Sequence, residues 1–164
     1  MRGRRHVVAG AAALAVAGGV AAVVVLVFSS GSQAAPTRAE YFARVARICK
    51  VYGPKLDRIA PPPDVTIPGE VASPLRRVIP LLDAENAEVR ALRPPPELAA
   101  KVGHWLALKD RVLATLRQTL RDAETPNISG TAVDYLRFLS QAQAAAKVGS
   151  EIGFPAVCSS PGSG

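Results

Sequence analysis

The chain has 164 residues, with 20 basic and 13 acidic side chains that give a formal net charge of +7. Arg2, Arg4 and Arg5 account for part of this excess, and the remaining charge is too weak and too scattered to indicate a nucleic-acid-binding protein. Aromatic residues make up only 5% of the chain, so we expect a core built mainly from aliphatic side chains.

Residues 1–28 combine this basic start with a long apolar stretch. Residues 7–28 are all Val, Ala, Gly, Leu or Phe. A helix of that length rises roughly 33 Å, which is enough to cross a hydrocarbon core of about 30 Å. Because Lys and Arg prefer the cytoplasmic side, we predict a single-pass transmembrane anchor with a cytoplasmic N-terminus and an extracytoplasmic C-terminal domain.

A cleavable signal peptide is the alternative interpretation of the same stretch. Residues 32–34 offer a small-residue cleavage site, and cleavage after Ala34 would make the protein secreted. The apolar stretch is longer than the roughly 7–15 residues of a signal-peptide core, which favours a retained anchor. Residues 29–37 are rich in Ser, Gly and Ala and are predicted to be a flexible linker.

Residues 38–158 are predicted to form an all-α domain, an antiparallel bundle of about four helices. Apolar side chains recur at steps of three and four from Tyr41 to Ile59, from Val71 to Leu92, over residues 96–123 and over residues 131–152. Thr37 and Glu40 fit a capping box at the start of the first helix, and Gly153 fits a C-terminal cap after the last. Residues 159–164 are predicted to be a disordered tail.

The same periodicity predicts which side chains face inward and where the helices bend. Pro54 predicts a kink or a split of the first helix over residues 50–53, and Pro80 predicts a bend over residues 76–79. On the second and third helices, Glu85, Glu88 and Lys109 are expected on the solvent side. On the fourth helix, the predicted inward residues are Val133, Leu136, Leu139, Ala142, Ala146 and Val148.

The only two cysteines, Cys49 and Cys158, both follow the predicted export segment. Two cysteines in an oxidising compartment usually pair. Cys49 lies on the predicted inner face of the first helix, and Cys158 follows the last helix. We therefore predict a structural disulfide that fastens the end of the domain to its beginning and closes a loop of about 110 residues. Two free thiols are the alternative.

The sequence shows no catalytic, cofactor-binding or metal-binding constellation. A catalytic histidine needs a nucleophile or an orienting acid, and a zinc site needs three or four ligands. His104 has neither within its predicted helix, so we expect it at the surface or at the boundary of the core. We predict no enzymatic activity, no cofactor and no metal.

Three stretches carry a resemblance to other proteins: YFARVARICKVYGPKLDRI at 41–59, IPLLDAENAEVRALRPPPEL at 79–98 and VGSEIGFPAVC at 148–158. They are similar to segments of uncharacterised exported helical proteins of high-GC actinobacteria. This resemblance implies a location in the cell envelope and a Cys49–Cys158 bridge. It implies no activity.

These observations predict a membrane-tethered extracytoplasmic helical domain, which is a non-enzymatic interaction or structural module of the bacterial cell envelope. Its partners would be the membrane, through the N-terminal helix, and an unidentified envelope protein or lipid. The alternative is a bundle that binds a small apolar ligand or a lipid between helices bent by Pro54 and Pro80. A wide cavity with an apolar lining would favour this alternative, and a solid core would count against it.

Overall fold

The computed structural model describes residues 35–125, 127–155 and 158 of the chain. The predicted anchor, most of the predicted linker and the predicted disordered tail lie outside these residues. Within the described part, no helix combines the length and the apolar character that crossing a lipid bilayer requires.

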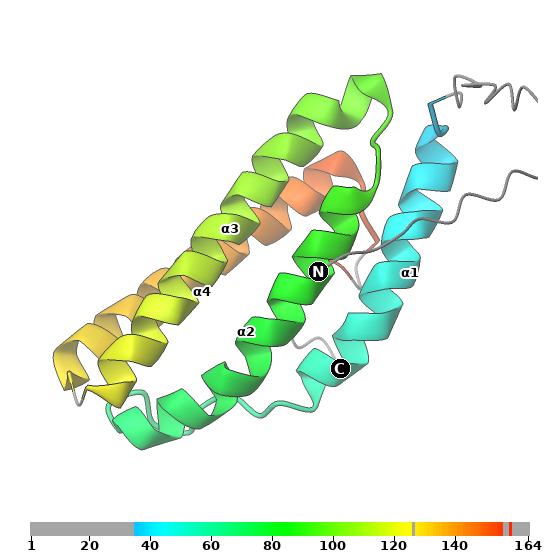
Figure 1. Ribbon diagram of the computed structural model, residues 1–164. Coiled ribbons are helices and arrows are strands. Elements are labelled where there is room, and N and C mark those ends of the chain that lie inside the picture. Colours follow the sequence, from blue (N-terminus) through cyan, green and yellow to red (C-terminus); the bar gives the residue numbers. More distant parts are fainter. Residues whose placement is uncertain (1–34, 126, 156–157, 159–164) are drawn as a thin grey trace, which may run out of the picture. The chain divides into compact units, whose positions relative to one another are not determined.

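Four α-helices make up the described residues: α1 (Arg38–Asp57), α2 (Pro68–Ala91), α3 (Pro96–Glu124) and α4 (Ile128–Ile152). Consecutive helices run in opposite directions, as the order of colours along the ribbon shows (Figure 1). The predicted antiparallel bundle of four helices is therefore confirmed.

Two of the three predicted helix-end signals are confirmed. The side chains of Thr37 and Glu40 complete the capping box at α1, where the Glu40 carboxylate accepts a 2.8 Å hydrogen bond from the Thr37 backbone N–H. Gly153 ends α4 in the left-handed conformation, with φ of 93°. The start of α4 differs from the prediction, because the Asn127 side chain caps Gly130 and the helix begins at Ile128 rather than at Thr131.

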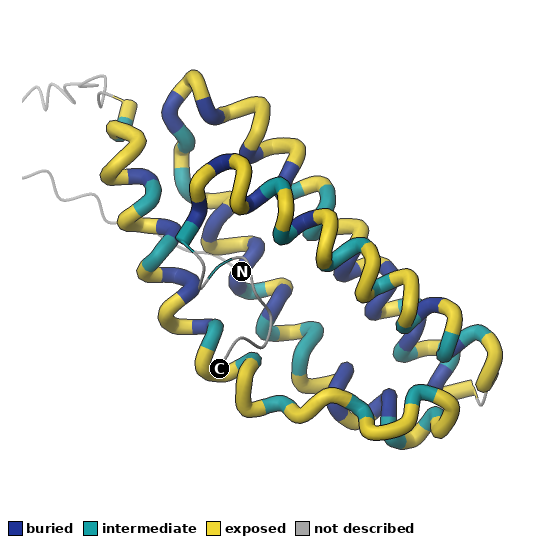
Figure 2. Tube along the Cα trace, turned by 180° about the vertical axis from the view of Figure 1, so that it is seen from behind, coloured by how far each residue is buried: buried dark blue, intermediate teal, exposed yellow. Residues whose placement is uncertain are grey.

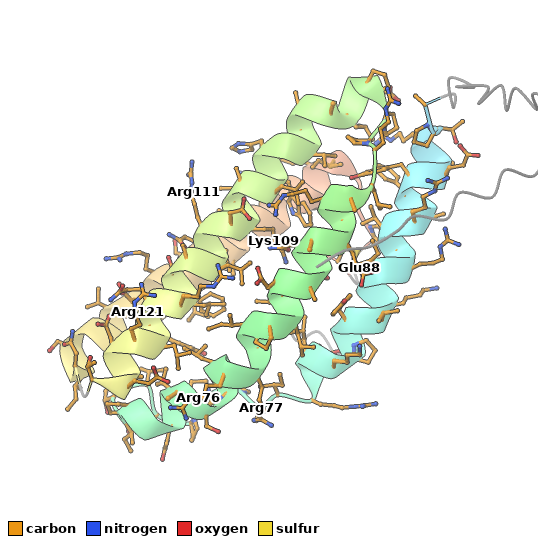
Figure 3. All side chains as sticks on the ribbon, viewed as in Figure 1. Arg76, Arg77, Glu88, Lys109, Arg111 and Arg121 are labelled. Carbon is orange, nitrogen blue, oxygen red and sulfur yellow. A yellow bond between two sulfur atoms is a disulfide. The ribbon has the colours of Figure 1, made fainter. Side chains whose placement is uncertain are left out.

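The two inner prolines have different outcomes. α1 continues as one helix through Pro54 to Asp57, so the predicted split over residues 50–53 is wrong. α2 also continues through Pro80, but its ribbon changes direction close to Arg76 and Arg77 (Figures 1 and 3). This bend agrees with the prediction, since a proline removes one backbone hydrogen bond and crowds the preceding turn.

Buried side chains form two clusters along the bundle. Figure 2 marks the buried residues in dark blue along the Cα trace. The first cluster joins α1 to the beginning of α3 and the end of α4, and includes Tyr41, Val45, Cys49, Val102, Trp105, Ile152 and Phe154. The second cluster joins α2 to the later half of α3, and includes Val71, Leu75, Leu82, Val112, Leu113 and Leu116. The inward faces predicted for the first three helices are therefore confirmed at these positions.

The segment after α4 is fastened to α1 by a covalent bond and by aromatic packing. Cys49 and Cys158 form the predicted disulfide, with a Cα–Cα distance of 5.3 Å. The Phe154 ring packs edge-on against Trp105, with centroids 5.1 Å apart, and edge-on against Phe42 at 5.7 Å. These contacts bring the end of the domain onto its first helix.

The predicted inward face of α4 is confirmed for Ala142, Ala146 and Val148, which are partly buried, and is wrong for three larger side chains. Val133, Leu136 and Leu139 are 55%, 62% and 41% exposed. The buried positions of α4 are instead Thr131, Asp134, Ala145, Gly149 and Ile152. Small and polar residues let α4 pack closely on α3, whose Thr115 and Thr119 are also buried. The prediction was wrong for Val133, Leu136 and Leu139 because large apolar side chains were assigned to the inside, whereas the contact with α3 uses smaller residues such as Ala145 and Gly149.

The bundle is open on one side because α1 packs against α2 and no Cα atom of α1 lies within 8 Å of one in α4. α4 instead packs along α3, and α3 along α2. Figure 1 shows α1 on the opposite side of α2 from the α3–α4 pair. The helices thus leave a space between the later half of α1 and α4, and this space holds the candidate site.

Candidate functional site

A cleft of about 480 Å³, the central cleft, lies between the four helices. Its wall comes from the end of α1 and the following residues 59–62, from α2 and α3, and from α4. The disulfide reaches it as well, through Cys158. Every helix of the described chain therefore contributes to this one space.

Most of the wall is apolar. α2 and α3 supply large side chains, Leu75, Val78, Leu82, Trp105, Val112 and Leu116. α4 supplies two aromatic rings, Tyr135 and Phe138, which lie 5.6 Å apart, and three alanines, Ala142, Ala145 and Ala146. The alanines matter for the volume because a larger side chain at these positions would project into the cleft. Burial raises the pKa of the Tyr135 hydroxyl, which keeps it neutral at physiological pH.

Two charged side chains lie in this apolar wall and face each other. The Glu85 carboxylate of α2 is 8% exposed and the Lys109 ammonium of α3 is 16% exposed, and they form an ion pair at 3.3 Å. The Lys109 Nζ also lies 5.5 Å from the centre of the Trp105 ring, within the range of a cation–π contact. Figure 3 shows Lys109 on the side of α3 that faces α2, whereas Arg111 points away from it.

The burial of this pair corrects the prediction that both charges lie on the solvent side. Leu82 and Val89 are buried on α2, and Glu85 occupies the inward position of the turn between them. Lys109 likewise follows Trp105 and precedes Val112 on the inner stripe of α3. The sequence does contain a sign of the buried pair, because one charged residue interrupts the apolar stripe of each helix. Neither helix alone reveals that these charges are buried, because the burial of each charge depends on the presence of the other.

Glu88, in contrast, lies on the exposed side of α2, as predicted. Its carboxylate accepts a 2.6 Å hydrogen bond from the Tyr52 hydroxyl of α1. This hydrogen bond raises the pKa of Tyr52, because it is made by the protonated hydroxyl. The contact joins α1 to α2 outside the central cleft, between these two helices. A shallow outer hollow beside it is lined by Arg44, Arg47 and Ile48, and by Glu88 itself.

The histidine singled out in the sequence lies apart from the central cleft. His104 is exposed on α3, as expected, and contributes nothing to the wall of the central cleft. Among the described residues, no three His, Cys, Asp or Glu side chains come close enough to hold a metal ion. The central cleft is a mostly apolar space whose polar wall residues include the Glu85–Lys109 pair, Asp57 and Tyr135.

Comparisons of this chain with protein-family models, with curated proteins and with solved structures find no match. The central cleft and the helices around it are therefore the basis for a functional proposal.

Proposed function

We propose that this protein is a membrane-tethered extracytoplasmic helical domain that binds a small apolar or amphipathic molecule in the central cleft. The observation that carries the proposal is the cleft itself, about 480 Å³ with predominantly apolar walls. Small-molecule sites are typically concave, mostly apolar and of roughly 300–1,000 Å³, with a few polar groups that orient the ligand. The Glu85–Lys109 pair supplies such polar groups.

The open side of the bundle gives the ligand a way in. Side chains join the start of α1 to the end of α4, but no Cα atoms of the two helices lie within 8 Å of each other, so an apolar molecule could enter beside the later half of α1 without unfolding a helix. Leu139 supports this route, because it lines the cleft and is also 41% exposed. A tether to the membrane would hold the domain beside a source of apolar molecules. The tether itself is proposed from residues 7–28 of the sequence.

Trp105 provides a direct test, because it is the only tryptophan of the chain and it lines the cleft. The full-length protein is reconstituted in nanodiscs and titrated with 2-bromodecan-1-ol, a ten-carbon alcohol whose bromine lies on the carbon next to the hydroxyl and quenches tryptophan on contact. We expect saturable quenching of Trp105 fluorescence. An unbrominated alcohol of the same length should compete with it.

A matched pair of α4 variants locates the binding. Ala142→Leu adds a larger side chain inside the cleft, and Ala144→Leu makes the same change on the exposed side. We expect Ala142→Leu to weaken quenching at least tenfold and Ala144→Leu to leave it unchanged. Equal quenching in both variants, or quenching that never saturates, would mean that the alcohol does not occupy the cleft, and the proposal would be wrong.

A second candidate function is favoured by the outer face of α4. Val133, Leu136 and Leu139 expose large apolar side chains along one helix, together with Ile128 at its start. Such a face is typical of contact surfaces between proteins. On this hypothesis, the domain is an interaction module for an envelope protein. A photo-crosslinking side chain at position 136 should then capture one partner in intact cells, whereas the same group at the exposed Ala144 should not.

A further inference from the structure

We propose that the ligand of the central cleft is a single-chain amphiphile with a neutral hydroxyl head, and that Glu85 and Lys109 together hold this hydroxyl. This inference rests on the proposed binding function and specifies which chemical class the cleft selects. It is carried by three properties of the ion pair: its place in the wall, its unused hydrogen-bonding capacity and its zero net charge.

The pair is a buried polar group in a mostly apolar wall. Both side chains line the cleft, and their neighbours in the wall are Trp105, Leu82 and Val112. The rest of the wall consists largely of aliphatic and aromatic groups, which suit a hydrocarbon chain. A volume of 480 Å³ corresponds to about 16 water molecules at roughly 30 Å³ each, so the cleft holds a chain of on the order of ten carbons.

The pair keeps hydrogen-bonding capacity for a ligand. An ammonium has three N–H donors, and the bond from Lys109 Nζ to Glu85 Oε2 uses one of them. A carboxylate has two oxygens with about four acceptor positions, so Glu85 can accept further hydrogen bonds. A hydroxyl both accepts and donates. It can therefore accept from Lys109 and donate to Glu85 without breaking the ion pair.

The zero net charge of the pair excludes a charged head group. A carboxylate on the ligand would compete with Glu85 for Lys109 and leave one negative charge unpaired among apolar side chains. An ammonium would compete with Lys109 for Glu85 in the same way. An unpaired charge away from water is costly, and breaking a buried pair costs more than the pair contributes. The neutral head group is the one that leaves both charges of the buried pair matched, and the third charged residue of the wall, Asp57, is exposed to water.

The test compares three ligands of equal chain length, decan-1-ol, decanoate and decylammonium, by competition against the brominated alcohol in the wild-type protein. We expect decan-1-ol to bind about tenfold more tightly than either charged ligand, because this is about what one hydrogen bond to a charged group contributes to binding. Glu85→Gln leaves Lys109 positive and should reverse the order in favour of decanoate. Lys109→Met leaves Glu85 negative and should favour decylammonium.

The double variant Glu85→Gln/Lys109→Met protects the test against misfolding, because it buries no unpaired charge. It should still bind decan-1-ol, about tenfold more weakly. Its preference for decan-1-ol over the two charged ligands should therefore be smaller than that of the wild type. Asp83→Asn/Arg117→Met is the matched control. It removes an exposed ion pair between the same two helices and should leave all three affinities unchanged.

The outcomes separate this inference from the function on which it rests. If none of the three ligands displaces the brominated alcohol, or if that alcohol itself fails to bind, the proposed function fails. If all three bind wild type equally, or if the single variants do not reverse the order, the cleft binds apolar chains but the assignment of the hydroxyl to Glu85 and Lys109 is wrong.

Discussion

Breaking the Cys49–Cys158 disulfide should destabilise the domain more than any single surface substitution. The bridge joins residues separated by 109 positions, so it encloses most of the described helices. In the chain-entropy model, the stabilisation comes from restricting the unfolded chain and grows with the size of the closed loop. The expected effect is therefore largest for a bridge of this kind, which links the first helix to the segment after the last.

The magnitude depends on the loop length. A separation of 109 residues corresponds to about 4.8 kcal/mol at 25 °C. Disulfides often deliver less, so we expect the free energy of unfolding to fall by about 3–5 kcal/mol on reduction. With a urea dependence of about 2 kcal/mol per molar for a domain of this size, the midpoint should fall by about 2 M.

Urea unfolding of the full-length protein in detergent, followed by Trp105 fluorescence, measures this difference with and without reductant. The double variant Cys49→Ala/Cys158→Ala is the control, because reductant cannot affect it. It should match the reduced wild type, apart from a small extra loss of packing at Cys49, which is 1% exposed. A reduced wild type that unfolds within about 1 kcal/mol of the oxidised protein would refute the reasoning.

Three further predictions concern single side chains. Phe154→Ala should lower the free energy of unfolding by about 3–5 kcal/mol in urea titrations, because the ring is buried against Trp105 and Phe42. Asn127→Ala should lower it by about 1 kcal/mol through loss of the cap at α4, and circular dichroism should show the bundle intact. Burial raises the pKa of Tyr41 to about 12, above the value near 10 of an unfolded chain, so its contribution to stability is complete below pH 10 and is lost as the pH rises towards 12. Tyr41→Phe should remove this loss in unfolding measurements from pH 9 to 11.5, and should leave stability at pH 7 unchanged or raised, because no described residue hydrogen-bonds the buried hydroxyl.

The faces of the first three helices could be predicted because apolar residues recur along each at helical spacing, even though Glu85 and Lys109 interrupt the stripes of α2 and α3. On α1, Tyr41, Val45 and Ile48 recur at steps of three and four, and all three are buried. The disulfide could also be predicted from the sequence, since only two cysteines exist and one lies on that stripe. These features depend on the order of residues along one helix, which is what a sequence displays directly.

The face of α4 could not be predicted in the same way. Its large apolar residues are spread around the helix, and Tyr135 and Phe138 turn towards the cleft while Leu136 stays outside. The contact with α3 depends on small residues such as Ala145 and Gly149, which allow the two helices to approach closely. Hydrophobic periodicity depends on which side chains are apolar. It does not indicate how closely another helix can approach.

The candidate site could not be predicted from the sequence, for a related reason. The cleft exists because the backbones of α1 and α4 stay more than 8 Å apart, and this depends on distances between helices that no local pattern encodes. Its polar pair required knowledge of two helices at once, since a buried charge is tolerated only opposite its counter-ion. Both features belong to the assembly of the bundle.

The Cys49–Cys158 disulfide closes a covalent ring of the chain, and this ring determines how the molecule responds to cleavage of its backbone. α2, α3 and α4 all lie between Cys49 and Cys158, as do the connections at residues 58–67 and 125–127. Hydrolysis of any single peptide bond in this interval leaves both fragments attached through sulfur. A nicked molecule would therefore migrate as one species until it is reduced, and its two pieces would stay together when either connection is cleaved by a protease.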